Sequence, residues 1–342
     1  MKVGILSGGG DAPGINAVIR AVVRKGIQHY GYEIVGIKDG WRGLLEGEFL
    51  PLDLKSPSGI LPRGGSILGT SRTNPFKQEN GAEKILENAK KTGIEAVVVI
   101  GGEDTLSVAY KMGEFGLKCV GVPKTIDNDL PETDYTFGFN TAVAIATETL
   151  DRLHTTAEAH HRVMILEVMG RYTGHIALEA GLAGGADVIL IPEKPFDIDE
   201  VCEYIKRRQE RGRNFSIIVV AEGAKPKGGA EIAYSESVDE FGHIRLGGVG
   251  YYLGKEIEKC MGIETRVVIL GHLQRGGSPT AFDRILATRF GIAAIDLVHE
   301  GKFGCMVAIK GNNMVSVPLK DVVGKRKTVD LELYDIASVF FG

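Results

Sequence analysis

Short apolar runs alternate with longer amphipathic stretches along most of the chain. Apolar runs such as Lys2–Ser7 and Ala96–Ile100 are bounded by polar or glycine residues, which predicts buried strands. Stretches such as Ile15–Gln28 and Thr105–Phe115 carry their apolar residues at helical spacing. This alternation predicts parallel sheets flanked by helices, so we expect an α/β fold of the doubly wound class.

The alternation occurs twice, which predicts two domains. A second series of strands and helices begins with the long helix predicted from Asn140 to Glu158. The expected first domain is 1–138 with about 275–322, and the expected second domain is 139–274 with about 323–342.

Two further stretches depart from this alternation. Lys225–Ile244 is polar and rich in glycine, without clear periodicity, and we expect an excursion such as a lid or a hairpin. The tail Val329–Gly342 is a short amphipathic segment that we expect to dock on a domain.

Composition and charge are those of an ordinary globular protein. Of 342 residues 25% are charged, and the net charge of −4 argues against a nucleic acid or a membrane surface as partner. The four cysteines are far apart and are expected to be reduced thiols of a cytoplasmic protein. The N-terminus leads directly into a strand, so we expect no signal peptide, and no apolar run is long enough to span a bilayer.

Glycine-rich loops follow several predicted strands. Ligands of doubly wound sheets bind at the carboxyl ends of strands, where glycine lets backbone amides approach a phosphate. The loop Ser7–Gly14 is not a dinucleotide fingerprint, because its glycines are contiguous, and it is not a P-loop, because no Gly-Lys-Ser/Thr follows. Taken alone, it is either a phosphate site or a tight turn. Arg72, at the end of the loop Gly64–Thr73, is either a phosphate clamp or a solvated cation.

Two stretches about twenty residues apart carry the strongest chemical signal. Gly101–Thr105 follows one apolar run and leads into a helix, whereas Pro123–Asp129 follows the next run and leads into a polar loop. Two glycines before a helix N-terminus favour an anion. Carboxylates and a lysine beside such a site indicate phosphoryl-transfer chemistry.

Six motifs in order resemble the phosphofructokinase family. They are Gly9–Gly14, Gly101–Thr105, Pro123–Asp129, Met169-Gly170-Arg171, Ala221-Glu222-Gly223 and Gly271–Gly277. The resemblance implies two α/β domains with the active site in the cleft between them, and Mg²⁺-dependent phosphorylation of the 1-hydroxyl of fructose 6-phosphate. It also implies a homodimer or homotetramer in which Arg162 and Arg266 complete a neighbour's site.

The resemblance also assigns roles to individual residues. Asp127 is the expected base, with Asp129 as the neighbouring carboxylate, and Thr125 is expected to bond the transferring phosphoryl group. Arg171 is expected to offset the charge on that group. The residues expected to bind fructose 6-phosphate are Thr125, Ile126, Asp127, Arg162, Met169, Gly170, Arg171, Glu222, Arg266, His272, Leu273, Gln274 and Arg275.

The donor site departs from the ATP-using members of the family. The residues expected to bind the donor or to set its identity are Gly10, Arg72, Gly102, Asp104, Thr105 and Lys124, and Glu103 occupies the position linked with Mg²⁺. ATP users typically carry glycine where this chain has Asp104, whose carboxylate fills the space of an α-phosphate and repels it. Lys124, which we also count as catalytic, is a compact cation suited to pyrophosphate. We therefore predict pyrophosphate as the donor and a reversible reaction of glycolysis and gluconeogenesis. An ATP-dependent 6-phosphofructokinase is the alternative.

Each of these residues, taken alone, could also have a purely structural role or lie in solvent. Asp104 could serve only as a helix N-cap, Lys124 as a solvated loop cation, and His272 as a core histidine. Arg162 and Arg266 could be solvated charges at strand ends. The ordered motif set outweighs these interpretations.

Two other classes of protein share parts of the pattern. A non-catalytic phosphate sensor on the same fold would lack the base or the arginine, but Asp127 and Arg171 are both present. A lipid, diacylglycerol or NAD kinase would lack the blocks Met169–Arg171 and His272–Gly277, which are also present.

Overall fold

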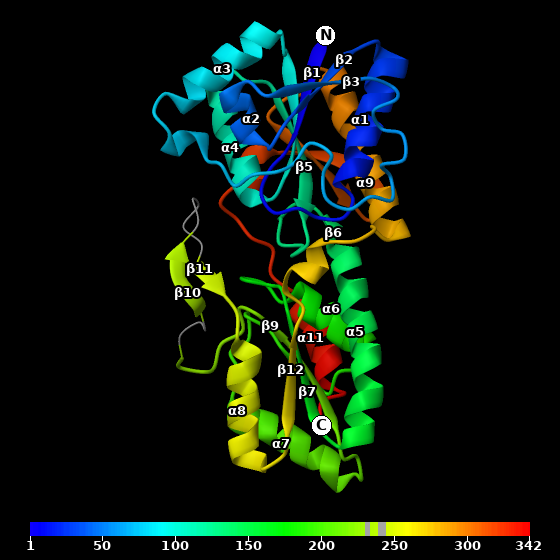
Figure 1. The fold of residues 1–342 in the computed structure, drawn as a ribbon, viewed down its shortest axis with the longest axis vertical. Helices are drawn as coiled ribbons and strands as arrows, with labels where there is room; N and C mark the ends of the chain where they lie inside the picture. The colour runs from blue at the N-terminus through cyan, green and yellow to red at the C-terminus, as the bar shows by residue number, and fades with distance from the viewer. Residues whose placement is uncertain (230–232, 239–243) are drawn as a thin grey trace. The chain divides into compact units, whose positions relative to one another are not determined.

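The structure, a computed structural model, describes residues 1–229, 233–238 and 244–342 (Figure 1). The chain forms two compact units, each with its own parallel sheet, which confirms the predicted α/β class. The first unit consists of Met1–Thr141 and Arg275–Arg326. The second consists of the described residues within 142–238, 243–274 and 327–342.

The sheet of the first unit has the strand order β14-β13-β5-β4-β1-β2-β3, and the short β6 pairs with β5. Its strands are β1 (Lys2–Ser7), β2 (Glu33–Ile37), β3 (Phe49–Leu52), β4 (Ala96–Gly101), β5 (Cys119–Thr125), β6 (Phe137–Gly138), β13 (Cys305–Lys310) and β14 (Asn313–Pro318). The central strands run parallel, and β3 and β14 close the two edges in antiparallel pairs. Every residue of β4 is buried, as expected for a strand covered on both faces.

Helices cover both faces of this sheet (Figure 1). One face carries α1 (Ile15–Tyr30) and α9 (Ala281–His299), and the other carries α2 (Trp41–Glu46), α3 (Gly81–Thr92), α4 (Glu103–Glu114) and α10 (Leu319–Val322). Side chains of β4 alternate between the two cores because successive residues of a strand point to opposite faces. Val98 and Ile100 join the core of α1 and α9, whereas Val97 and Val99 join the other core.

The second unit has a four-stranded parallel sheet in the order β12-β7-β9-β8. Its strands are β7 (Val163–Val168), β8 (Val188–Leu190), β9 (Ser216–Ala221) and β12 (Thr265–Ile269). Its helices are α5 (Phe139–His160), α6 (His175–Ala183), α7 (Ile198–Glu210), α8 (Val249–Met261) and α11 (Leu331–Ser338). α7 and α8 share one core with this sheet, and α11 packs on α6, so the C-terminal tail docks as predicted.

Part of the predicted excursion forms the hairpin considered for it. β10 (Ala233–Val238) pairs antiparallel with β11 (Ile244–Leu246). Residues 230–232 and 239–243 of the same stretch lie outside the described residues. Within the described part of the chain, no helix combines the length and hydropathy needed to cross a bilayer.

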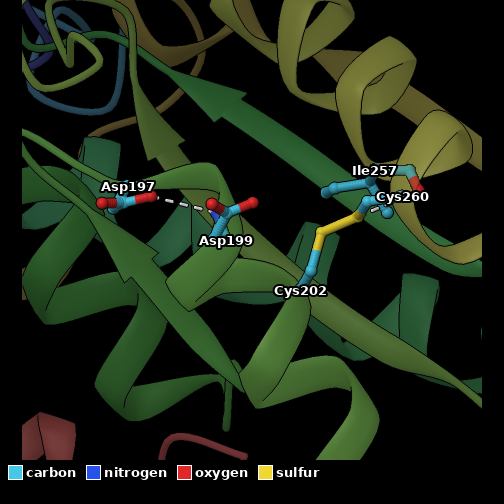
Figure 2. The surroundings of a disulfide bond; sticks show 5 residues. All are labelled: Asp197, Asp199, Cys202, Ile257 and Cys260. Atoms are coloured by element: carbon cyan, nitrogen blue, oxygen red, sulfur yellow. Dashed lines mark hydrogen bonds between the residues drawn. A yellow bond between two sulfur atoms is a disulfide. The ribbon is translucent and has the colours of Figure 1, made fainter.

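The expectation of four reduced cysteines was wrong. Cys202 of α7 and Cys260 of α8 form a disulfide with a Cα–Cα distance of 6.8 Å (Figure 2), whereas Cys119 and Cys305 are free thiols. The two bonded cysteines are separated by 58 residues. Spacing in the sequence could not reveal the pair, because the packing of α7 beside α8 is what brings the sulfurs together.

This disulfide is expected to stabilise the second unit. A crosslink across 58 residues lowers the entropy of the unfolded chain, which adds about 4 kcal/mol to the free energy of unfolding in the loop-entropy treatment. We therefore expect Cys202→Ala to lower the melting temperature in scanning calorimetry, and dithiothreitol to lower that of the wild type but not of the variant. Cys305→Ala removes a free thiol and serves as the control. A wild-type melting temperature that does not respond to dithiothreitol would contradict the prediction.

Candidate active site

The loop that joins β1 to α1 is held by neighbouring backbone and by a close guanidinium. The Gly9 amide donates to the Ser71 carbonyl at 2.9 Å, and the Thr70 hydroxyl donates to the Gly9 carbonyl at 2.7 Å. Gly9 has a φ of +79°, a left-handed conformation that favours glycine. A Cβ atom at Gly10 would lie 2.6 Å from Nη1 of Arg275, so glycine allows the guanidinium to lie against this loop.

The second glycine pair lies where β4 ends and α4 begins. Gly102 is the N-cap residue, and Glu103 and Asp104 occupy the first turn of the helix. The interpretation of Asp104 as an N-cap is therefore wrong. The side chain of Thr105 is buried, and a Cβ atom at Gly101 would lie 2.3 Å from its Cβ, which explains the need for glycine there. The two acidic side chains thus put negative charge at a helix N-terminus that would otherwise attract an anion.

β5 is longer than its apolar run predicts. The sequence predicts a strand that ends at Val122, but β5 continues to Thr125. The extension is paired on both sides, because Pro123 lies opposite Gly101 of β4 and Lys124 lies opposite Phe137 of β6. Lys124 therefore belongs to a strand and not to a loop.

Lys124 is buried, with only 3% of its surface exposed, so it is not a solvated cation. Its ammonium group donates to the Gly8 carbonyl at 2.8 Å and also to the Gly10 carbonyl. Burial lowers the pKa of Lys124 to about 7, and the nearby charges of Arg275 and Arg72 act in the same direction. Two nearby carboxylates oppose this shift. The lysine thus joins the loop after β1 to the end of β5.

The turn after β5 is fixed by its own side chains. The Asp127 amide donates to Oγ1 of Thr125 at 3.1 Å. Asn128 has a φ of +53°, a conformation that asparagine tolerates better than most residues, and its Oδ1 accepts the Thr136 amide at 3.0 Å. These bonds hold the positions of Asp127 and Asp129 on either side of Asn128 in the chain.

The two aspartates of this turn interact strongly. Burial, and then the charge of Asp127, raise the pKa of Asp129 to about 7. The charge of Arg326 and a hydrogen bond from Thr125 act in the opposite direction. Two carboxylates this close are stabilised by a proton or by a cation near them.

The acidic residues of this region are compatible with a magnesium ion that is held together with a phosphate ligand. Among the described residues, no three His, Cys, Asp or Glu side chains gather as a metal-binding group. Glu103, the residue predicted for the metal, accepts the Gly324 amide on Oε1 at 2.9 Å. Mg²⁺ is commonly held by one or two carboxylates together with substrate phosphates and water, so the chemistry of Asp127, Asp129 and Glu103 is compatible with it.

In the second unit, the loop after β7 is tied to a fully buried glutamine. Oε1 of Gln274 accepts the Met169 amide at 2.7 Å. Gly170 has a φ of +141°, and a Cβ atom there would lie 2.6 Å from the Thr173 carbonyl oxygen. Nη1 of Arg171 is buried and makes no hydrogen bond to the described residues, so it retains a donor for an anion.

The predicted site residues divide between the two units. The first unit holds Gly10, Arg72, Gly102, Glu103, Asp104, Thr105, Lys124, Thr125, Ile126, Asp127, Asp129 and Arg275. The second unit holds Arg162, Met169, Gly170, Arg171, Glu222, Arg266, His272, Leu273 and Gln274. Each unit therefore carries its own group of these residues near the ends of its strands.

The sequence profile described as Phosphofructokinase matches residues 2–298. The chain belongs to the phosphofructokinase family. It is 60% identical, over 100% of both chains, to the Streptomyces coelicolor protein named pyrophosphate--fructose 6-phosphate 1-phosphotransferase. It is 52% identical, over 96% of both chains, to ATP-dependent 6-phosphofructokinase 3 of the same organism.

A solved phosphofructokinase structure agrees with this membership. The pyrophosphate-dependent phosphofructokinase of Marinobacter aquaeolei superposes with a TM-score of 0.83 at 25% identity, over 97% of this chain and 86% of that one. The family resemblance drawn from the six motifs is therefore confirmed.

Two arginines predicted for the sugar phosphate share one carboxylate, which the motifs had not indicated. Arg162, which directly precedes β7, and Arg266 of the adjacent strand β12 both donate to Glu264. They are therefore ion-paired and not simply solvated charges at strand ends. His272 and Leu273 are exposed on a short 3₁₀ turn, so His272 is not a core histidine.

Glu264 and Arg326 lie outside the six motifs of this phosphofructokinase, and motif reasoning missed both. Glu264 stands two residues before Arg266, a spacing at which side chains of a strand share a face. Arg326 belongs to the basic triplet 325–327, which is the only sequence signal that could have directed attention to it. Neither signal is specific without the contacts.

Replacing Asp129 by asparagine is expected to stabilise the ligand-free protein above neutral pH. The pKa of this carboxyl is raised from 3.8 to about 7 by folding, so its ionised form opposes folding and stability falls as the pH rises through this range. Asp129→Asn should raise the free energy of unfolding by on the order of 2 kcal/mol at pH 8, allowing for solvent screening, and by less at pH 5. Thermal unfolding without Mg²⁺ at both pH values measures the effect. The exposed Asp335→Asn is the control for charge, and equal effects of the two variants at pH 8 would contradict the prediction.

Proposed function

We propose that this protein transfers a phosphoryl group from pyrophosphate to the 1-hydroxyl of fructose 6-phosphate, giving fructose 1,6-bisphosphate and phosphate in a reversible reaction. The choice of donor rests on two residues that occur together in this chain: Asp104 in the first turn of α4, and the buried Lys124. The name of the 60% identical relative supports the same donor. The name of the 52% identical relative keeps ATP as the alternative that experiment must exclude.

The donor is selected by charge and space at the start of α4. The amides of a helix N-terminus attract phosphate, but Glu103 and Asp104 already supply negative charge at this end of the helix. An α-phosphate of ATP would have to enter beside the Asp104 carboxylate, where like charges repel. Pyrophosphate lacks that group, so it avoids this repulsion.

Lys124 supports donor binding by holding the glycine loop in place, not by extending its side chain to the donor. Its ammonium group is already bonded to the carbonyls of Gly8 and Gly10, so it holds the glycine loop in a fixed conformation. Its positive charge remains close to a phosphate bound by the amides of that loop. The donor would thus bind the unit formed by Met1–Thr141 and Arg275–Arg326.

The acceptor side uses a carboxylate base and a guanidinium. Asp127 takes the proton of the 1-hydroxyl as its oxygen bonds to phosphorus, a role that a weak base fills when proton transfer is late. The Thr125 hydroxyl and the buried Nη1 donor of Arg171 stabilise charge on the transferring group. Asp127, Asp129 and Glu103 would hold Mg²⁺ together with the phosphates, and this ion would neutralise part of their charge.

The second unit supplies the groups for the sugar phosphate. Arg162 and Arg266 converge on the Glu264 carboxylate, which stands in for a phosphate bound by two guanidinium groups. We assign these arginines to the site of a neighbouring copy in a homodimer or homotetramer. The other sugar ligands that we assign to this unit are Met169, Gly170, Arg171, Glu222, His272, Leu273 and Gln274.

A coupled assay that compares donors tests this function directly. The protein is expected to form fructose 1,6-bisphosphate from fructose 6-phosphate with pyrophosphate and Mg²⁺, and much more slowly with ATP or polyphosphate. Removal of Mg²⁺ with EDTA should abolish turnover. Faster turnover with ATP than with pyrophosphate would overturn the donor assignment.

Asp104→Gly tests the reason for the choice. Removing the carboxylate removes both its bulk and its repulsion, so kcat/KM for ATP should rise at least tenfold relative to that for pyrophosphate. Glu114→Gly removes a carboxylate at the other end of α4 and should leave the ratio of kcat/KM for the two donors unaltered. An unchanged preference in Asp104→Gly would show that another residue excludes ATP.

A further inference from the structure

The loop that follows β7 is held at both of its ends by side chains from elsewhere in the second unit. The hydrogen bond from the Met169 amide to Gln274 holds the first end. At the other end, the Gly174 amide donates to both carboxylate oxygens of Glu193, at 3.0 and 3.2 Å. Gly174 is also the N-cap residue of α6. The loop that carries Arg171 therefore runs between two fixed points.

The same carboxylate also holds the C-terminal segment of the chain. Oε1 of Glu193 accepts the Val329 amide at 3.1 Å, although the two residues lie 136 positions apart in the sequence. Val329 is buried, and Nε2 of His175, the first residue of α6, lies 3.3 Å from the Lys327 carbonyl oxygen. Glu193 thus joins the end of the loop, the start of α6 and the segment that precedes α11.

The middle of the loop is packed against neighbouring backbone. A Cβ atom at Gly223 would lie 1.9 Å from the Arg171 carbonyl oxygen, so glycine is needed for the two stretches of backbone to touch. The Gly223 amide donates to the Gly170 carbonyl at 3.1 Å. A shift of either end of the loop would therefore move the Arg171 backbone, and with it the buried Nη1 donor.

We propose that Glu193 is a positioning residue for phosphoryl transfer, which acts by fixing the loop that carries Arg171. The inference rests on the role proposed above for Arg171, which is to offset charge on the transferring group. A carboxylate suits this task because its two oxygens accept several backbone amides, and hydrogen bonds to a charged acceptor are stronger than those to a neutral one. The guanidinium has to lie within hydrogen-bonding distance of the transferring group, so a small displacement of the loop lowers the rate of transfer.

A purely structural role makes different predictions. If Glu193 only stabilised α6 and the C-terminal segment, its removal would lower the melting temperature and leave kcat of the folded enzyme unaltered. If it positions Arg171, its removal lowers kcat, and that loss disappears once Arg171 itself is removed. The KM for pyrophosphate then stays the same, because we assign the donor to the other unit. A double-mutant cycle separates the two roles.

The test measures kcat of Glu193→Ala, Arg171→Ala and the double variant, at a temperature at which calorimetry shows each to be folded. We expect Glu193→Ala to lower kcat at least tenfold and to leave the KM for pyrophosphate within twofold of the wild type. Glu193→Gln, which keeps one acceptor oxygen, should lose less. The double variant should stay within twofold of Arg171→Ala.

Asp197→Ala is the matched control. Asp197 accepts the Asp199 amide at 3.0 Å at the start of α7 (Figure 2), so it is also a carboxylate bonded to backbone at a helix N-terminus of the second unit. Its removal should lower the melting temperature but keep kcat within twofold of the wild type. An unchanged kcat in Glu193→Ala, an equal loss in Asp197→Ala, or losses that multiply in the double variant would overturn the proposal.

Failure of the proposed function is recognised separately. A wild-type kcat in Arg171→Ala would refute the role proposed for Arg171, and the inference on Glu193 with it. A wild type that turns over only ATP would refute pyrophosphate as the donor. The same cycle, measured with ATP, would then still decide whether Glu193 acts through Arg171.

Discussion

The ammonium group of Lys124 lies out of water and bonds the carbonyls of Gly8 and Gly10, and much of the donor region depends on this contact. A buried cation is costly to desolvate unless acceptors surround it, and here two backbone carbonyls and nearby carboxylates do so. The contact fixes the glycine loop on β1 relative to the end of β5. When it is protonated, Lys124 also places a positive charge inside the loop, which would offset part of the repulsion between the nearby carboxylates and a phosphate.

Carboxylates shape the choice of ligand around this cation. Glu103 and Asp104 occupy a helix N-terminus, and Asp127 and Asp129 share a short turn in which one raises the pKa of the other. Such crowding of like charge is unfavourable in the ligand-free protein and becomes favourable when a cation and a phosphate bind together. This arrangement is the basis on which we propose a compact, highly charged donor. A longer nucleotide would meet the Asp104 carboxylate first.

In the second unit, a carboxylate holds positively charged side chains together. Glu264 accepts hydrogen bonds from both Arg162, which precedes β7, and Arg266 of β12, so the two guanidinium groups are held at one carboxylate. Gln274 fixes the Met169 backbone through a fully buried amide side chain. If these residues bind the sugar phosphate as we propose, both contacts would order them in advance and reduce the side-chain entropy lost on binding.

The sequence alone was sufficient for the α/β class, the family and the chemical types at the site, because apolar periodicity and motif spacing are local properties of the chain. Only the tertiary structure decided that Lys124 is buried on a strand, that Cys202 bonds Cys260, and that the Gly324 amide donates to Glu103. Each of these depends on a contact between segments brought together by packing, such as the bond from Lys124 to Gly8, which lies 116 positions earlier in the sequence. The local pattern of apolar residues determines which face of a helix or strand is buried. Which distant residue that face contacts is determined by how whole elements pack.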